Sequence, residues 1–100
     1  MALPTEQQVA RVEVCYHELK CWPDSFQALR RGTKTAEFRR DDRDFRLGDL
    51  LILREWRPDE SGGGDYTGEA IFGLYISHIE KGFGIPEGFA MLTVKRLRRR

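Results

Sequence analysis

Hydrophobic and polar residues alternate with a period of two near the start of the chain, a pattern typical of a half-buried β-strand. The first set of alternating positions is Arg11, Glu13, Cys15 and His17, and the second is Ala10, Val12, Val14 and Tyr16. We therefore expect a strand over residues 9–19 that stops before Pro23.

A short helix is predicted at about residues 23–31. Pro23 suits a first helical turn, where its missing N–H is not needed, and Asp24 is favourable at the positive end of the helix dipole. Phe26 and Leu29 follow helical spacing, and Gly32 is a natural C-terminal stop.

Four further strands follow from alternation and from runs of apolar residues. They are expected over 34–40, 50–53, 70–79 and 89–94, with loops at 58–68 and 82–88. In the first of these strands we expect Ala36 and Phe38 to face the core, and Thr35, Glu37 and Arg39 to face the opposite side.

One helix and about five strands in 100 residues predict a mainly β (α+β) domain, a small barrel or curved sheet. The helix after the first strand would plug one end, so a ligand would bind in a cleft at the rim. We expect a flexible N-terminus over 1–8, a single domain over 9–94 and a basic tail over 95–100.

Composition narrows the class of protein. No apolar run approaches the ~20 residues of a membrane span. Residues 1–6 lack a basic n-region and an apolar h-region, so we do not expect a secretory signal. The two cysteines are too few for a disulfide scaffold, so a cytoplasmic protein with reduced thiols is expected.

The net charge of +1 conceals an uneven distribution. Residues 95–100 hold five basic side chains and no acid, which leaves 12 basic against 16 acidic residues in positions 1–94. Residues 30–46 hold seven basic residues against four acids. Local basic density of this kind attracts polyanions, although a solvated face or a solubilising tail has the same composition.

The segment from Gly32 to Arg39 carries the most chemistry. Lys34 and Arg39 supply cations that suit phosphate, and Glu37 is an acceptor for a base amine or an attacking water. Together these groups match the needs of a nucleotide. A ladder of salt bridges on a solvated sheet face remains the structural alternative.

No metal or other cofactor is predicted. The zinc-competent residues Cys15, His17, Cys21 and His78 lack a CxxC pair and match no common structural zinc spacing. The acidic run 41–46 lacks the glycine and distal glutamate of a calcium loop. Cys–His hydrolase chemistry would need closer contacts than neighbours on one strand face provide.

Aromatic residues near the basic segment and in the loops are candidates for stacking on bases. They are Tyr16, Trp22, Trp56, Tyr66 and Phe83. We rank Trp22, at the helix start, as the best of these candidates.

Several spaced motifs together resemble the DUF3850 family, which belongs to the ASCH/PUA-like superfamily. The motifs are His17-Glu18-Leu19-Lys20-Cys21-Trp22-Pro23, Phe26, Gly32-x-Lys34-Thr35-x-Glu37-x-Arg39, Asp42-Arg43-Asp44-Phe45, Gly48-Asp49, Tyr66-Thr67-Gly68 and Gly82-Phe83-Gly84-Ile85-Pro86-Glu87-Gly88-Phe89. The resemblance covers about residues 17–94 and implies a PUA-type barrel with a cleft beside the helix, and binding of RNA or nucleotides.

Some members of the superfamily hydrolyse acylated cytidines with a Lys, a Thr and a Glu. Lys34 matches that lysine, Glu37 occupies the threonine position, and the longer segment that carries the third residue is lacking here. This departure argues against amidase activity.

We therefore predict an RNA- or nucleotide-binding domain with a cleft lined by Lys34, Glu37 and Arg39. The expected binding residues are His17, Lys20, Trp22, Lys34, Thr35, Glu37, Arg39 and Arg43. A small hydrolase acting on a modified nucleoside or RNA, with Lys34 and Glu37 catalytic, is the first alternative. A protein-interaction domain with an apolar patch around Trp56, Phe72 and Tyr75 is the second.

Overall fold

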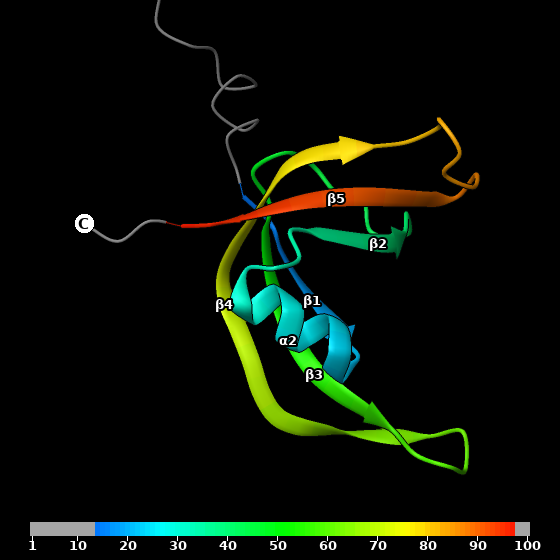
Figure 1. Cartoon of the computed structure of the whole chain (residues 1–100). Coiled ribbons are helices and arrows are strands. Elements are labelled where there is room, and N and C mark those ends of the chain that lie inside the picture. Colours follow the sequence, from blue (N-terminus) through cyan, green and yellow to red (C-terminus); the bar gives the residue numbers. More distant parts are fainter. Residues whose placement is uncertain (1–13, 98–100) are drawn as a thin grey trace, which may run out of the picture.

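The computed structural model describes residues 14–97, which form a curled, five-stranded half-barrel with one helix (Figure 1). The elements are β1 (Tyr16–Cys21), α2 (Pro23–Arg31), β2 (Ala36–Arg40), β3 (Leu50–Pro58), β4 (Gly64–Glu80) and β5 (Phe89–Arg96). The strand order is β1-β3-β4-β5-β2, so β1 and β2 are the two edges of the sheet. β1 pairs with β3 in parallel, and the other pairs are antiparallel. The predicted fold class is confirmed.

The predicted elements are recovered with shifted ends. The helix is confirmed, and its glycine stop Gly32 has the left-handed conformation. β1 begins only at Tyr16, and the earlier part of the predicted strand, like residues 1–8, lies outside the described residues. The last strand continues to Arg96, two residues into the predicted tail, of which residues 98–100 are not described.

The long strand β4 gives the sheet its curl. Between Leu51 and Leu53 of β3, the paired positions on β4 move from Leu74 to Ile71, so β4 carries an extra residue there. Gly73 lies in this bulge with φ 77°, a conformation that glycine adopts without steric cost. The predicted loop over 58–68 is shorter in the structure, because β4 already begins at Gly64.

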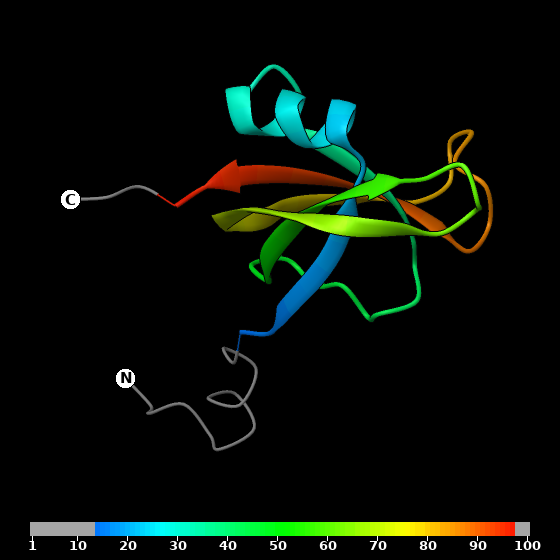
Figure 2. The ribbon, with the colours of Figure 1, turned by 90° about the horizontal axis from the view of Figure 1, so that it is seen from below.

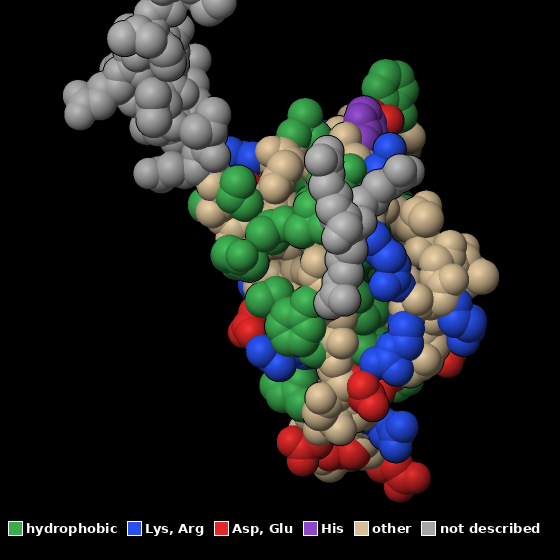
Figure 3. Space-filling model, turned by 90° about the vertical axis from the view of Figure 1, so that its left-hand side faces the viewer, with side chains coloured by type: hydrophobic (Ala, Val, Ile, Leu, Met, Phe, Trp, Pro, Cys, Tyr) green, Lys and Arg blue, Asp and Glu red, His purple; other side chains and the backbone are tan. Residues whose placement is uncertain are grey.

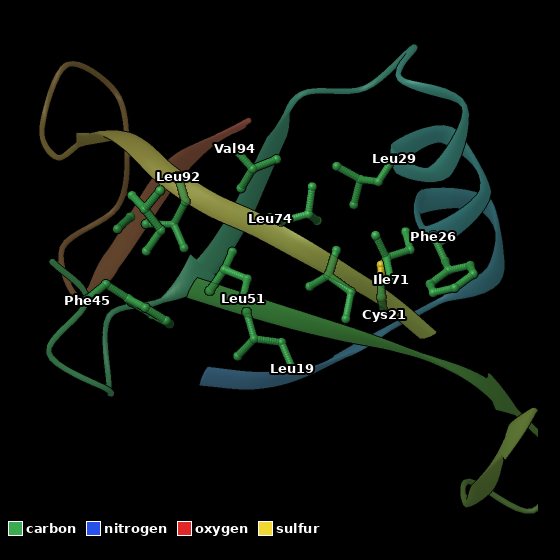
Figure 4. Packing of buried hydrophobic residues seen from close by; sticks show 13 residues of the cluster. Leu19, Cys21, Phe26, Leu29, Phe45, Leu51, Ile71, Leu74, Leu92 and Val94 are labelled. Carbon is green, nitrogen blue, oxygen red and sulfur yellow. The ribbon is translucent and has the colours of Figure 1, made fainter. Parts of the chain in front are cut away.

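α2 lies over one face of the curled sheet (Figure 2), and the hydrophobic core fills the space between them (Figure 4). Phe26 and Leu29 of α2 point toward the strand side chains. The largest fully buried side chains are Phe26, Leu19, Leu51, Leu53, Ile76 and Leu92. No helix of residues 14–97 has the length and apolar character needed to cross a membrane.

The predicted facing of β2 is wrong. Glu37 is buried, with 5% of its surface exposed, whereas Phe38 is 42% exposed. The register explains this reversal, because Glu37 lies opposite the fully buried Leu92 of β5. Phe38 instead packs edge-to-face on Phe89, with 5.2 Å between ring centroids. The inner face of β2 therefore presents a carboxylate where an aromatic ring was expected.

Candidate functional site

The curl of the sheet brings its two edges together, and we call the line where β1 faces β2 the seam. Side chains bridge it: Arg39 Nη1 donates to the carbonyl oxygen of Lys20 at 2.8 Å, and Arg43 Nη1 donates to that of Glu18 at 2.6 Å. Both arginines thus hold backbone acceptors on the free edge of β1. The seam is where an open β-sheet leaves backbone groups available for contacts.

A carboxylate lies on the inner side of this seam. Glu37 Oε2 accepts a weak hydrogen bond from the Cys21 thiol, with 3.8 Å between sulfur and oxygen. Burial raises the pKa of Glu37, and the nearby cations of Lys34 and Arg39 oppose that rise. Burial, together with the charge of Glu37, raises the pKa of Cys21 to about 11. The thiol is therefore protonated at neutral pH and able to donate.

These groups open into a hollow of about 270 Å³, which we call the Glu37 hollow. It is lined by Lys20, Cys21, Trp22, Ser25, Glu37 and Arg39. Sequence reasoning did not assign Cys21 and Ser25 to the site. Ser25 lies three residues after Trp22 on the first turn of α2, so helical spacing beside a predicted site residue was the available signal.

Trp22 stands at the rim of the Glu37 hollow. It precedes Pro23 in an extended conformation at the N-cap of α2, as expected for a residue before proline. Its side chain is 62% exposed and lies 6.5 Å from the ring of Trp56, between centroids. The Lys20 ammonium lies 4.6 Å from the Trp56 ring, a cation–π contact. A free aromatic face and a cation therefore flank the buried carboxylate.

Lys34 lies beside the Glu37 hollow and does not line it. Its ammonium donates to Ser25 Oγ, while the turn after α2 fixes its backbone through a 3.1 Å bond to the carbonyl of Ala28. The ion pairs of residues 14–97 within 4.0 Å do not include one between Lys34 and Glu37. Thr35 is exposed, and its carbonyl accepts from the N–H of Val94 at 2.9 Å.

His17 does not join the other predicted site residues. Its Nε2 lies 2.7 Å from Asp49 Oδ2, and its ring packs edge-to-face on Phe45 at 4.8 Å. Four residues along β1 separate it from Cys21, roughly 13 Å in a strand. Asp49 also accepts from the backbone N–H of Arg46 at 3.1 Å. This pair anchors the turn before β3.

The zinc-competent side chains do not gather. Across residues 14–97, the structure holds no group of three or more His, Cys, Asp or Glu side chains arranged to hold a metal. Cys21 faces Glu37, and His78 lies near Glu80 at 3.4 Å.

A larger groove of about 640 Å³ lies toward the C-terminal end of α2. It is lined by the aliphatic residues Leu29, Leu74 and Val94, by the aromatic Tyr75, and by the cations Lys34, Lys95 and Arg96. The lining contains no carboxylate, so the groove lacks the acceptor for a base amine that Glu37 supplies in the smaller hollow. The smaller Glu37 hollow therefore suits nucleotide chemistry better than the larger groove does.

The family model for DUF3850, described as a domain of unknown function, matches residues 16–94. The chain belongs to this family. A protein of Escherichia phage P2, described as an uncharacterized 12.9 kDa protein in the GpA 3' region, is 48% identical over 40 residues. That match covers 40% of this chain and 37% of the phage protein. The chain therefore matches less than half of the relative's length.

Proposed function

We propose that this DUF3850 domain binds RNA or a nucleotide, with a base in the Glu37 hollow. The observation that carries the proposal is the buried carboxylate of Glu37 at the bottom of a hollow whose rim holds Arg39, Lys20 and an exposed Trp22. Carboxylate oxygens accept from exocyclic base amines, Arg and Lys hold phosphate, and an indole ring stacks on a base.

The raised pKa of Glu37 supports the proposal, because it reflects a carboxylate that burial has removed from water. A buried carboxylate with one weak thiol donor has unused acceptor capacity, which a base amine would fill. Membership of the ASCH/PUA-like superfamily, expected from the motifs, agrees with an RNA or nucleotide ligand. A cytoplasmic setting, where these ligands are abundant, is part of the proposal and accords with two free cysteines.

Intrinsic fluorescence offers a direct test. In a Trp56→Phe variant, Trp22 is the one remaining tryptophan of the sequence, so stacking of a base would quench a signal from the proposed site itself. We expect titration with nucleotides and short RNA oligonucleotides at low salt to quench this fluorescence, and Glu37→Gln to weaken the binding.

Arg57→Ala is the matched control for charge removal, because Arg57 is exposed on β3 and does not line the Glu37 hollow. It should bind like the parent. No quenching and no binding at low salt for any nucleotide or oligonucleotide would refute the proposal.

The hydrolase alternative depends on Lys34 reaching the substrate. Because its ammonium is bound to Ser25 outside the lining of the Glu37 hollow, we expect Lys34→Ala to retain binding. Turnover of N4-acylcytidine that disappears in Lys34→Ala would instead favour the hydrolase.

A second candidate function, self-association, rests on an apolar outer face. Tyr16, Leu50 and Tyr75 are cross-strand neighbours on β1, β3 and β4, and Phe72 is 62% exposed. Figure 3 shows hydrophobic side chains gathered over the middle of one face, with acidic side chains at its lower end. Sedimentation of the wild type and Tyr75→Lys tests this candidate: a dimer that Tyr75→Lys dissociates supports it, and a monomeric wild type excludes it.

A further inference from the structure

Three hollows meet along the seam. Beside the Glu37 hollow lies one of about 200 Å³, the Tyr66 hollow, lined by Glu18, Leu19, Lys20, Arg39, Arg43, Arg54 and Tyr66. A third of about 350 Å³, the Phe38 hollow, is lined by Phe38, Arg39, Arg40, Asp42, Arg43 and Phe89. Arg39 lines all three hollows. The Tyr66 hollow shares Lys20 and Arg39 with the Glu37 hollow, and Arg39 and Arg43 with the Phe38 hollow, so a ligand larger than one nucleotide can extend from one hollow to the next.

Each hollow carries one exposed aromatic side chain. Trp22 is 62% exposed, Tyr66 is 53% exposed and Phe38 is 42% exposed. Exposed aromatic rings at regular places along a basic path are the means by which proteins hold successive unpaired bases. The aromatic ring that sequence pattern placed in the core thus becomes a third stacking surface.

Cations outnumber acids along this path. The lining residues include Lys20, Arg39, Arg40, Arg43 and Arg54 against Glu18, Glu37 and Asp42. Arg54 is held by Glu18 at 2.7 Å, whereas Arg39 and Arg43 each use Nη1 on a backbone carbonyl. Arg43 Nε also lies 4.0 Å from Asp42 Oδ1. A guanidinium has five N–H donors, so both arginines keep donors for phosphate at the points where the hollows meet.

We infer that the ligand is a single-stranded stretch of about three nucleotides, with one base in each hollow and the linking phosphates over Arg39 and Arg43. This inference rests on the proposed function and narrows its ligand from a free nucleotide to a strand. A duplex does not suit the site, because paired bases are stacked inside the helix and cannot lie on side-chain rings.

The test is a length series of single-stranded RNA from one to five nucleotides, measured by Trp22 quenching and by competition. Affinity is expected to rise to about three nucleotides and then to level off. Two phosphate contacts predict a slope of about −1.4 for log K against log salt concentration. A duplex of the same sequence should bind more weakly.

Variants in the other two hollows test whether the second and third bases bind there. Tyr66→Ala and Phe38→Ala should each weaken binding of the trinucleotide by about tenfold and leave mononucleotide binding unchanged. Tyr16→Ala and Phe72→Ala are matched controls, since both side chains are exposed and line none of the three hollows. They should bind like the parent.

The outcomes separate this inference from the proposed function. The inference of a single-stranded ligand is refuted if a mononucleotide binds as tightly as the trinucleotide, or if Tyr66→Ala and Phe38→Ala leave trinucleotide binding unchanged. The proposed nucleotide binding would stand in either case. If a duplex binds as tightly as the single strand, the inference of a single-stranded ligand is also refuted. If nothing binds, both fail.

Discussion

Two buried glutamates, Glu37 and Glu55, have equal exposure and opposite surroundings. Each has 5% of its surface exposed. Glu55 accepts from Thr67 Oγ1 at 2.8 Å and from Gln27 Nε2 at 3.1 Å, so it ties α2 to β3 and β4. Glu37 accepts from a thiol at 3.8 Å. The chain supplies good donors to the first carboxylate and a poor one to the second.

The pKa shifts follow this difference. Hydrogen bonds from Thr67 and Gln27 lower the pKa of Glu55, whereas burial raises that of Glu37. A buried acid whose donors come from its own fold serves the structure. A buried acid with spare acceptors beside a hollow is available to a ligand, which is the role proposed for Glu37. Burial alone does not distinguish the two roles.

The largest effect is expected from truncating the two acids in parallel. Glu55→Ala removes the acceptor of two side-chain donors and should lower the free energy of unfolding by about 1–3 kcal/mol. Glu37→Ala loses only the weak thiol bond and should cost less. Urea unfolding of both variants measures this difference. Equal losses of unfolding free energy would contradict a structural role for Glu55 and a proposed binding role for Glu37.

A second comparison uses pH, because the two acids should bias stability in opposite directions. The lowered pKa of Glu55 gives stability that is present above the ordinary value of 4.5 and is lost as pH falls. The raised pKa of Glu37 gives stability that is present below 4.5 and is lost as pH rises through the raised value.

Glutamine variants should reveal these signs. Relative to wild type, Glu37→Gln should become more stable as pH rises above 4.5. Glu55→Gln should become less stable relative to wild type as pH rises toward 4.5, because only the wild type gains stability there. Thermal unfolding from pH 3 to 8 measures both differences. Curves of the same slope for the two variants would refute the comparison.

The smallest effect concerns the thiol beside Glu37. In a Cys15→Ser protein, Cys21 should react slowly with iodoacetamide at pH 8, because its pKa is about 11 and its side chain is buried. The charge of Glu37 contributes to that high pKa, so adding Glu37→Gln should speed the labelling a few-fold. An unchanged rate would show that the carboxylate does not act on the thiol.

Local signals predicted the helix well, and non-local register decided the site. Pro23 and Gly32 fix the ends of α2 through their own backbone preferences, so the sequence suffices there. The facing of Glu37 depends on its pairing with Leu92, more than fifty residues later in the chain. Alternation in an edge strand gives the period but does not say which face is inside.

The bridging of the seam could not be read from sequence for the same reason. Arg39 and Arg43 are predicted from sequence as binding residues, but their bonds to the Lys20 and Glu18 carbonyls require the sheet to curl. Tyr66 was noticed as a loop aromatic, and the structure places it on β4 beside Arg54 in one hollow. His17 was assigned by its type and lies instead with Asp49.

The strand order has a consequence for the time course of folding. β3, β4 and β5 follow one another in sequence and pair as antiparallel neighbours. The two edge strands pair with more distant partners. α2 and β2 separate β1 from its partner β3 in the sequence, and β3 and β4 separate β2 from its partner β5. Contacts between distant segments form slowly because large loops must close first. We therefore expect the central three strands to assemble early and the two edges to dock last. Binding competence would then mark the final step of folding, later than the appearance of β-structure.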